Sequence, residues 1–351
     1  MQSIKLKNYA KINLAIDVLS RRIDGYHEVD MIMSTVDLCD EVTLSTKSDI
    51  DKGWFLLDEN IDIIVNDPTV PTDSRNLVCK AVKNFKDYVK EKNIKKNNFL
   101  DDVDFYDVKE KRAFEIQINL NKNIPSSAGL AGGSGNAAAV LHALNIVTNS
   151  GLSVDELIVI AKKIGADVPF LVLTVANLND EIKEYQAGLD KKSMLQATLA
   201  VRARGVGEKL EPVNSFDAFV LLVNPGFDVF TGEVYSRLNL WDEQGNKVIK
   251  KEGNCIEKFQ CMLNSEYSDE VDYDKLKTFM KNDLESYTLK AYPEVKKIKE
   301  ALAELAPESI VMMSGSGPTV YAIADSPITL EKAYNEFRGK YRVVHIVRML
   351  K

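Results

Sequence analysis

A glycine-rich loop that runs directly into an apolar segment is the feature that most constrains this chain. Residues 124–136 read IPSSAGLAGGSGN, and residues 137–144 read AAAVLHAL. Small residues leave the backbone N–H groups of the loop uncovered, and the strong helix formers behind them predict a helix N-terminus beside the loop. The helix dipole and the converging amides favour an anion, and glycine lets the backbone approach it closely. The loop therefore predicts a phosphate site; the alternative is a turn that only tightens a corner of the fold.

The loop differs from two common nucleotide-binding motifs. No Gly-Lys-Ser or Gly-Lys-Thr follows the glycines, so it is not a Walker loop. Gly-x-Gly-x-x-Gly is also absent, which weakens a dinucleotide interpretation.

Length and composition indicate a globular protein of two domains. The chain has 351 residues, of which 45% are hydrophobic and 28% charged, and this length suggests more than one core. We expect an N-terminal domain over 1–170 and a C-terminal domain over 171–351. The formal net charge of -7 argues against a broad nucleic-acid surface but is compatible with a local pocket for a phosphorylated small molecule.

Cysteine and histidine usage gives little support for a metal site. Four cysteines without a Cys-x-x-Cys pair, together with three histidines, predict reduced thiols and no metal-ligating cluster. The first residues lack an apolar signal region, and no segment approaches the ~20 apolar residues that span a bilayer. We therefore expect a cytoplasmic protein with no membrane partner; its oligomeric state is not predicted.

The N-terminal segment alternates apolar and polar residues and predicts one or two strands over 4–10 and 12–18. Lys11 interrupts this pattern. A lysine between apolar strand positions commonly points into solvent, so a surface role is the alternative to a functional one.

A turn at Asp24-Gly25 places an aromatic ring beside an imidazole, in Tyr26 and His27. This pair suits a planar base. The alternative is an ordinary hairpin tip on the surface.

A carboxylate candidate follows a helix with a capping box at Ser153 and Glu156. That helix is expected to end near Gly165, which puts Asp167 just past its end. We expect Pro169 to block helix continuation and to keep Val168 extended.

The other patterns predict an α+β fold. Asn76 is a candidate N-cap for an amphipathic helix that begins at Leu77. The charge-dense stretches 86–112 and 170–196 are interpreted as surface excursions. Further strands are expected at 31–36, 41–44, 114–120, 198–203, 216–223, 310–313, 319–324 and 342–350, a hairpin over 54–65, and helices at 231–235, 273–287, 295–305 and 330–337.

Several of these motifs together resemble the GHMP kinases, and the resemblance covers most of the chain. The motifs that carry it are Ala10-Lys11-Ile12-Asn13-Leu14, Arg22 to His27, the loop from Ile124 to Ala139, Gly165 to Phe170, Asn282 to Glu285, and Met313 to Gly317. The resemblance implies a ribosomal-S5-like N-terminal domain, a ferredoxin-like C-terminal domain, and ATP and Mg²⁺ as cofactors.

The resemblance also implies the reaction and the residues that perform it. The Tyr-His pair after Asp-Gly implies a small-molecule acceptor that carries cytidine diphosphate, phosphorylated on a hydroxyl in non-mevalonate isoprenoid precursor synthesis. Asp167 would accept the hydroxyl proton, and Lys11 would steady this carboxylate and the charge on the transferred phosphoryl group. The acceptor would be held by Asn13, Tyr26 and His27. The nucleotide would be held by Asn76, Leu77, Lys122, Pro125, Gly129, Leu130, Gly132, Gly133, Ser134 and Asn136.

The loop departs from the family pattern at two positions. Ala131 stands where the family often has glycine, and Gly135 replaces a serine whose hydroxyl would face phosphate or metal. We expect Ala131 to have a φ that tolerates a Cβ, and Gly135→Ser to improve ATP binding or turnover where the backbone φ is below zero. The stretches 86–112 and 170–196 are interpreted as insertions relative to the family.

Two other functions fit the same motifs. One is a divergent GHMP kinase that acts on another alcohol. The other is a catalytically silent nucleotide-binding regulator, which has no need of a paired lysine and aspartate.

Overall fold

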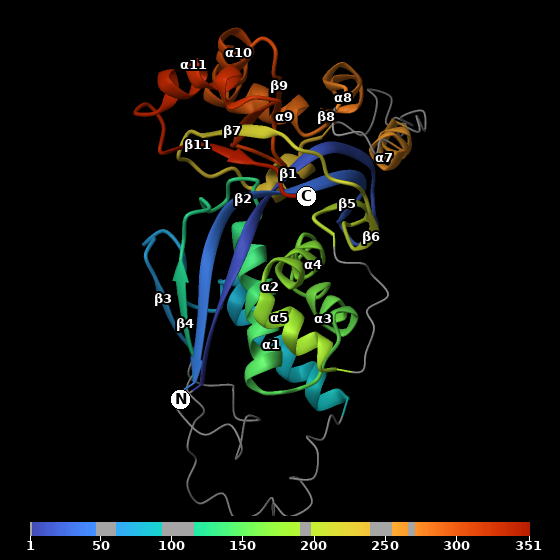
Figure 1. Ribbon diagram of the computed structural model, residues 1–351, viewed down its shortest axis with the longest axis vertical. Coiled ribbons are helices and arrows are strands. Elements are labelled where there is room, and N and C mark those ends of the chain that lie inside the picture. The colour runs from blue at the N-terminus through green and yellow to red at the C-terminus, as the bar shows by residue number, and fades with distance from the viewer. Residues whose placement is uncertain (1, 47–60, 93–115, 190–197, 239–254, 266–270) are drawn as a thin grey trace, which may run out of the picture. The chain divides into compact units, whose positions relative to one another are not determined.

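The computed structural model describes residues 2–46, 61–92, 116–189, 198–238, 255–265 and 271–351 (Figure 1). The chain divides into two compact units. The first unit comprises residues 1–9, 39–123 and 132–197, and the second comprises 10–38, 124–131 and 198–351. Helices and mixed sheets confirm the α+β class. The domain boundary expected at residue 170 stays a prediction.

Two long strands open the chain, β1 (Gln2–Arg21) and β2 (His27–Thr46), and each contributes residues to both units. Lys11 lies inside β1, so the opening pattern is one continuous strand. The turn at Asp24-Gly25 between β1 and β2 is also confirmed, with Gly25 at a φ of 88°.

In the first unit, β4 (Ile116–Asn121) pairs antiparallel with the end of β2. Strand β3 (Ile61–Val65) pairs in parallel with β4. Residues 61–65 of the hairpin predicted over 54–65 form a strand; the hairpin itself stays a prediction, because residues 54–60 lie outside the described residues.

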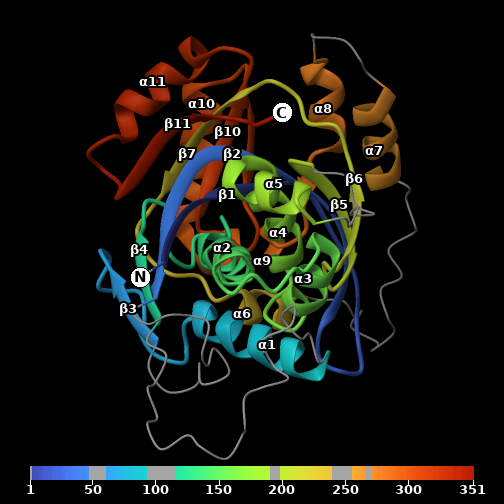
Figure 2. The same cartoon turned by 60° about the horizontal axis from the view of Figure 1, so that its bottom comes forward.

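Five helices of the first unit pack together, with α2 between α1 and α4 (Figures 1 and 2). They are α1 (Leu77–Glu91), α2 (Gly132–Val147), α3 (Val154–Ala161), α4 (Val168–Leu178) and α5 (Asp180–Ala187). The N-cap at Asn76 and the capping box at Ser153 are confirmed. His142 in α2 is buried, and this burial lowers its pKa to about 4, so the imidazole is neutral in the core.

The surface excursion predicted over 170–196 is wrong for its first part. Phe170 is fully buried in α4, and α4 contacts both α2 and α3. A helix that is apolar on nearly every side belongs in a core. The charged residues that suggested a surface segment lie in α5, and residues 190–196 are outside the described residues. Of the stretch 86–112, residues up to Glu91 belong to α1, and 93–112 are likewise outside.

Part of the second unit adds strands beside β1 and β2. Strand β5 (Ala200–Gly205) pairs with β2, β6 (Lys209–Pro212) pairs with β5, and β8 (Lys281–Asn282) pairs in parallel with β1. No sequence pattern predicted β6, which follows a turn after Gly205, where φ is 80°.

The second unit also contains a four-stranded antiparallel sheet in the order β11-β7-β10-β9. Its strands are β7 (Phe219–Asn224), β9 (Ile310–Met313), β10 (Val320–Ala324) and β11 (Val343–Arg348). Helices α10 (Pro293–Leu305) and α11 (Pro327–Phe337) pack on it (Figure 1). The strands predicted at 310–313 and 319–324 are confirmed as β9 and β10, which pair antiparallel. The residues between them that contain Gly315 and Gly317 are called the C-terminal glycine turn.

The single helix predicted over 273–287 is wrong. The structure has α8 (Tyr273–Phe279), the short strand β8 and α9 (Glu285–Ala291). The Asn282 side chain accepts a hydrogen bond from the Leu284 N–H, which gives this backbone an alternative to helix. The remaining helices are α6 (Thr231–Ser236) and α7 (Cys255–Ser265). Among the described helices, none is long and apolar enough to cross a membrane.

Candidate active site

The glycine-rich loop leads directly into the start of α2, as predicted. The helix begins at Gly132, so Gly133 and Ser134 lie in its first turn. The first N–H groups of a helix have no partner within the helix, and its dipole makes this end positive. Gly133 is exposed, and a Cβ there would lie 3.9 Å from Leu77 of α1. This end of α2 is therefore a chemically suitable anion site.

The other half of the loop belongs to the second unit and is tightly packed. The Ser314 hydroxyl donates to the Gly129 carbonyl at 2.9 Å. A Cβ on Gly129 would lie only 2.1 Å from the backbone carbonyl oxygen of Ser314. Gly129 also has a φ of 74°. Only glycine fits both the conformation and the contact. Leu130 is fully buried, and Pro125 is half-buried in the same stretch.

Ala131 does not have the conformation that we expected. Its φ is 56°, in the left-handed region, where an L-residue with a Cβ is strained. The expectation that the φ of Ala131 tolerates a Cβ is therefore wrong, and the alanine lowers the stability of the fold at this position. The neighbouring Gly132 begins α2, so the strain lies at the start of the helix.

Lys11 is buried in β1 with an exposed fraction of 3%, which excludes the solvent-facing alternative. Its Nζ donates to the Asn13 side-chain oxygen at 2.5 Å, and its backbone N–H donates to the Leu130 carbonyl at 3.1 Å. The same Nζ lies 3.4 Å from where a Cβ on Gly315 would stand. The ammonium group is thus held beside Gly315 of the C-terminal glycine turn, while the Lys11 backbone is bound to the loop at Leu130.

Asn282 and Glu285 fix the C-terminal glycine turn. The Asn282 amide donates to the carbonyls of Met313 and Gly315, both at 2.8 Å, and the Glu285 carboxylate accepts from the Met313 N–H at 2.8 Å. Because the buried Asn282 amide binds the backbone carbonyls at both ends of this stretch, it holds the turn in one conformation. These residues position Gly315 beside Lys11.

The predicted acceptor residues lie in two places of the second unit. Asn13 is buried and bound to Lys11, and the Tyr321 hydroxyl donates to its backbone carbonyl at 2.6 Å. At the turn after β1, Tyr26 is 64% exposed, whereas His27 is 9% exposed. Burial, with a contribution from Arg21, lowers the pKa of His27, so this ring is neutral near pH 7.

Tyr235 is a neighbour of His27 that the sequence did not reveal. Its ring lies on α6, and its centroid is 5.1 Å from that of His27. Aromatic pairs at this separation attract one another. The only signal was an aromatic residue in a short predicted helix.

A pocket of the first unit ends next to Asn76 and Leu77, two of the predicted nucleotide-binding residues. Its volume is about 540 Å³. Asn76 and Leu77 follow it at the start of α1; the Asn76 amide caps that helix and donates to Pro71 at 2.7 Å. The pocket is lined by Ile63, Ile64, Val65, Pro68, Val70, Pro71, Thr72, Asp73 and Arg75.

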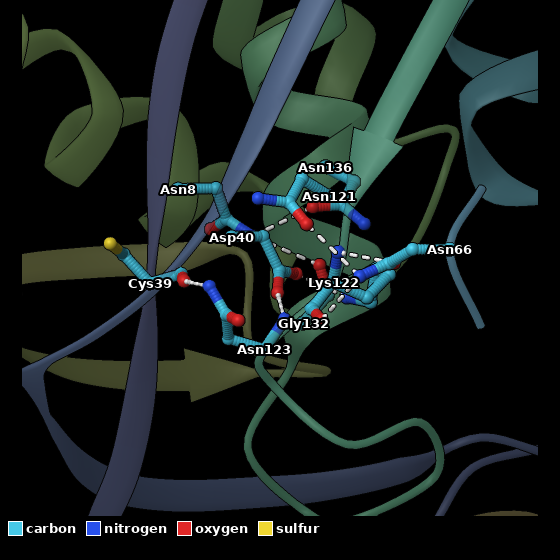
Figure 3. Close-up of polar contacts among 9 residues, drawn as sticks. All are labelled: Asn8, Cys39, Asp40, Asn66, Asn121, Lys122, Asn123, Gly132 and Asn136. Atoms are coloured by element: carbon cyan, nitrogen blue, oxygen red, sulfur yellow. Dashed lines mark hydrogen bonds and ion pairs between the residues drawn. The ribbon is translucent and has the colours of Figure 1, made fainter. Parts of the chain in front are cut away.

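Lys122 and Asn136, two further predicted nucleotide residues, lie in one buried polar cluster (Figure 3). The Lys122 ammonium forms an ion pair with Asp40, which is fully buried. The Asn8 amide donates to the Asn136 oxygen at 3.0 Å. Asn8 and Asp40 were not predicted as site residues. A signal for Asn8 existed, since it falls on the buried phase of β1 between Leu6 and Ala10.

Asp167 is the N-cap of α4 and is half-buried. The prediction that Pro169 keeps Val168 extended is wrong, because a new helix, α4, begins at Val168 with the proline in its first turn. Proline is favoured there, since the N–H it lacks would be unpaired in any case. The Asp167 side chain makes no capping hydrogen bond.

The predicted site residues thus fall into separate groups. Lys11, Asn13, Gly129 and Leu130 come together in the second unit. Lys122 and Asn136 come together in the first unit, where Asp167 also lies.

Comparison with known proteins places the chain among the kinases. The N-terminal domain of the GHMP kinases matches residues 76–174, and their C-terminal domain matches residues 267–343. The chain belongs to the GHMP kinase family. A 4-diphosphocytidyl-2-C-methyl-D-erythritol kinase of Clostridium perfringens is 38% identical over 99% of this chain and 98% of that protein. One from a Geobacillus species is 36% identical over 98% of this chain and 96% of its own.

Solved structures show the same fold. A crystal structure of 4-(cytidine 5'-diphospho)-2C-methyl-D-erythritol kinase has a TM-score of 0.60 at 22% identity, covering 99% of this chain and all of that one. Homoserine kinase from Cytophaga hutchinsonii has a TM-score of 0.61 at 16% identity, covering 100% and 95%. This GHMP kinase therefore has the expected α+β GHMP fold, and it is an ATP-dependent small-molecule kinase.

The strain at Ala131 generates a first prediction. Ala131→Gly removes a Cβ from the left-handed region and should raise the free energy of unfolding by about 1 kcal/mol. Denaturant-induced unfolding measures it. Gly129→Ala is the matched comparison in the same loop and should lower stability, because its Cβ meets Ser314. Equal stability of Ala131→Gly and the original chain would show that the turn relaxes around the alanine.

Proposed function

We propose that this kinase transfers the γ-phosphoryl group of ATP to the 2-hydroxyl of 4-diphosphocytidyl-2-C-methyl-D-erythritol. The observation that carries the proposal is the buried ammonium of Lys11 beside Gly315, in the C-terminal glycine turn. Burial of a lysine is costly, and a fold keeps it where the charge acts on something. The assignment of the substrate is supported by relatives that are 34–38% identical over nearly the whole chain and are named 4-diphosphocytidyl-2-C-methyl-D-erythritol kinase.

ATP binding is supported by two features of the first unit. The first turn of α2 offers backbone N–H groups and a positive dipole to the phosphates. The pocket before α1 has apolar walls from Ile63 and Val65 and is of a size for adenine, with Asn76 and Leu77 beside it. We assign the phosphates to the first place and the base to the second.

Mg²⁺ enters the proposal with the nucleotide. This ion prefers phosphate oxygens and water to an all-protein cage, and it neutralises charge on the phosphates when bound. Ser134 is a half-buried oxygen donor in the first turn of α2 and fits as a ligand there.

The chemistry requires alignment and charge neutralisation more than covalent help. In the proposal the acceptor oxygen attacks the γ-phosphorus, Asp167 takes the hydroxyl proton, and ADP leaves. Asp167 is suited to this because its carboxylate is not used to cap α4. Lys11, held by Asn13, stabilises the negative charge that the phosphoryl group carries in the transition state.

Recognition of the acceptor is assigned to the turn between β1 and β2. Tyr26 presents an exposed ring, and His27 is backed by Tyr235. A neutral imidazole and a phenol are flat surfaces on which a cytosine can stack. Asn13 is assigned to the acceptor alcohol, beside Lys11.

Two other assignments belong to the same proposal. We keep the division into domains 1–170 and 171–351, and we place the enzyme in the cytoplasm, in isoprenoid precursor synthesis. The alternative of a silent regulator is disfavoured by the buried Lys11, and a different acceptor by the Tyr26–His27 turn.

Catalysis is tested by removing each charge. Asp167→Asn should abolish turnover, because an amide cannot take up the proton, and Lys11→Ala should lower it at least a hundredfold, or ~3 kcal/mol of barrier. Turnover is followed by ADP release at saturating substrates.

Matched controls exist on the same kinds of element. Asp180→Asn changes a carboxylate in the first turn of α5, and Lys5→Ala removes an exposed lysine of β1 that pairs with Glu41; both should keep full turnover. A loss below tenfold in Lys11→Ala would end its catalytic assignment.

Recognition is tested by separating the two substrates. Tyr26→Ala and His27→Ala should weaken binding of the cytidine acceptor about tenfold, as stacking on a base contributes ~1–3 kcal/mol, and should leave the Kd of ATP within about twofold. Calorimetric titration measures both. Tyr334→Ala, on α11, serves as the aromatic control. Equal weakening of acceptor and ATP would mean that the pair supports the fold and does not contact the base.

A further inference from the structure

Asn8 of β1 is completely buried against the start of α2, in the cluster that Figure 3 draws. Its Nδ2 donates to the Gly132 carbonyl and to the Asn136 side-chain oxygen, both at 3.0 Å. Gly132 is the first residue of α2, and Asn136 lies one turn later. A single side chain from the strand therefore binds two successive turns of the helix.

The Asn8 amide also occupies the position that a side chain at 135 would take. A Cβ on Gly135 would lie 1.6 Å from Asn8 Oδ1, 2.1 Å from Cγ and 2.4 Å from Nδ2. Overlap of this size cannot be relieved by a small shift, because Asn8 is held by its two hydrogen bonds. The expectation that Gly135→Ser improves ATP binding is therefore wrong, although Gly135 has no positive φ. Residue 135 is glycine because Asn8 is there.

Within the described residues, Asn8 Oδ1 has no hydrogen-bond partner. An unpaired buried amide oxygen costs free energy, about 1–3 kcal/mol. A residue placed only for stability would be apolar here, as Leu6 and Ala10 are on the same face of β1. The hydrogen bonds that Asn8 Nδ2 donates to α2 explain why an asparagine stands at this position.

Asn136 extends this contact to a buried ion pair. In one orientation its oxygen accepts from Asn8; with the amide turned over, its nitrogen donates to Asp40 at 3.0 Å and its oxygen accepts from Lys122 at 3.1 Å. Asp40 also accepts from the Asn123 N–H at 2.7 Å. The two sets of Asn136 contacts are alternatives, and the hydrogen bond from Asn8 to the Gly132 carbonyl is present with either.

We propose that Asn8 is a positioning residue for the phosphate-binding end of α2, and that its amide replaces a side chain at position 135 in that task. By fixing Gly132 and Asn136, it sets the direction of the first N–H groups of the helix. The proposal rests on the assignment of the ATP phosphates to this end of α2. It makes positions 8 and 135 reciprocal, so that a small residue at one accommodates a side chain at the other.

The test is a double-mutant cycle of Asn8→Ala, Gly135→Ser and the two together. Asn8→Ala should raise the Kd and KM of ATP about tenfold, with kcat within about threefold, because the helix end loses its orientation but no reacting group. Gly135→Ser alone should be strongly destabilised or fail to fold. In the double variant the serine occupies the vacated space, and its Kd for ATP should return to within about threefold of the original.

Asn179→Ala is the matched control. Asn179 is a buried asparagine that binds the backbone of Lys7, the residue before Asn8, and the end of α4. It should lower the melting temperature as Asn8→Ala does, without changing the Kd of ATP. If Asn8→Ala changes only the melting temperature, Asn8 is a structural residue and the proposal is wrong.

The outcomes separate this proposal from the proposed function. Failure of the unaltered enzyme to bind ATP would contradict the function itself. Normal ATP binding with no coupling between positions 8 and 135, measured in unfolding free energy, would overturn the reciprocity alone. Where Gly135→Ser alone does not fold, folding of the double variant is the sign of coupling, and a double variant that also fails to fold would overturn the reciprocity.

Discussion

Close approach of backbone to its surroundings is the constraint on which both halves of the glycine loop depend. At Gly129 the chain passes the Ser314 carbonyl with no room for a Cβ, and at Gly135 the helix passes the Asn8 amide in the same way. Neither contact could form with any other residue. Each brings a structural element against the loop: the C-terminal turn in the second unit and β1 in the first. The glycines therefore do two things, exposing N–H groups and admitting the elements that hold them.

Each of the two units also contains a buried lysine near the glycine-rich loop. In the second unit Lys11 is held by Asn13 beside Gly315, and in the first unit Lys122 is held by Asp40. Both ammonium groups are buried, and a buried charge requires a partner of fixed geometry. Lys122 is paired with the buried Asp40 carboxylate, and we assign it to the fold around the start of α2. Lys11 is assigned to the transferred phosphoryl group because its ammonium lies beside Gly315.

Much of the fold could be predicted, because periodicity and capping are local. The start of α1 at Asn76, the capping box of α3 and the β9–β10 pair all follow from short-range patterns. The failures came from contacts between distant residues. Burial of α4 against α2, and the hydrogen bonds from the Asn282 amide to the Met313 and Gly315 carbonyls, cannot be read from neighbouring residues.

The candidate site divides in the same way. Its motifs were recognisable as residue types at fixed spacing, and the glycine loop with its helix was found from these alone. The reason for Gly135 was not, because Asn8 lies 127 positions earlier in the chain. Tyr235 was missed for the same reason: its significance depends on the ring of His27. A polar residue on the buried phase of a strand, such as Asn8, is the kind of sequence signal that repays closer attention.

The central claim concerns the acceptor, and competition between acceptors tests it most directly. The purified enzyme with ATP and Mg²⁺ is offered 4-diphosphocytidyl-2-C-methyl-D-erythritol, mevalonate or homoserine, and ADP release is measured for each. Our account predicts a kcat/KM for the cytidine compound at least a hundredfold above the other two, because only it can stack on Tyr26 and His27, and ~3 kcal/mol corresponds to this ratio. Comparable values for all three, or phosphorylation of another alcohol in preference, would contradict it.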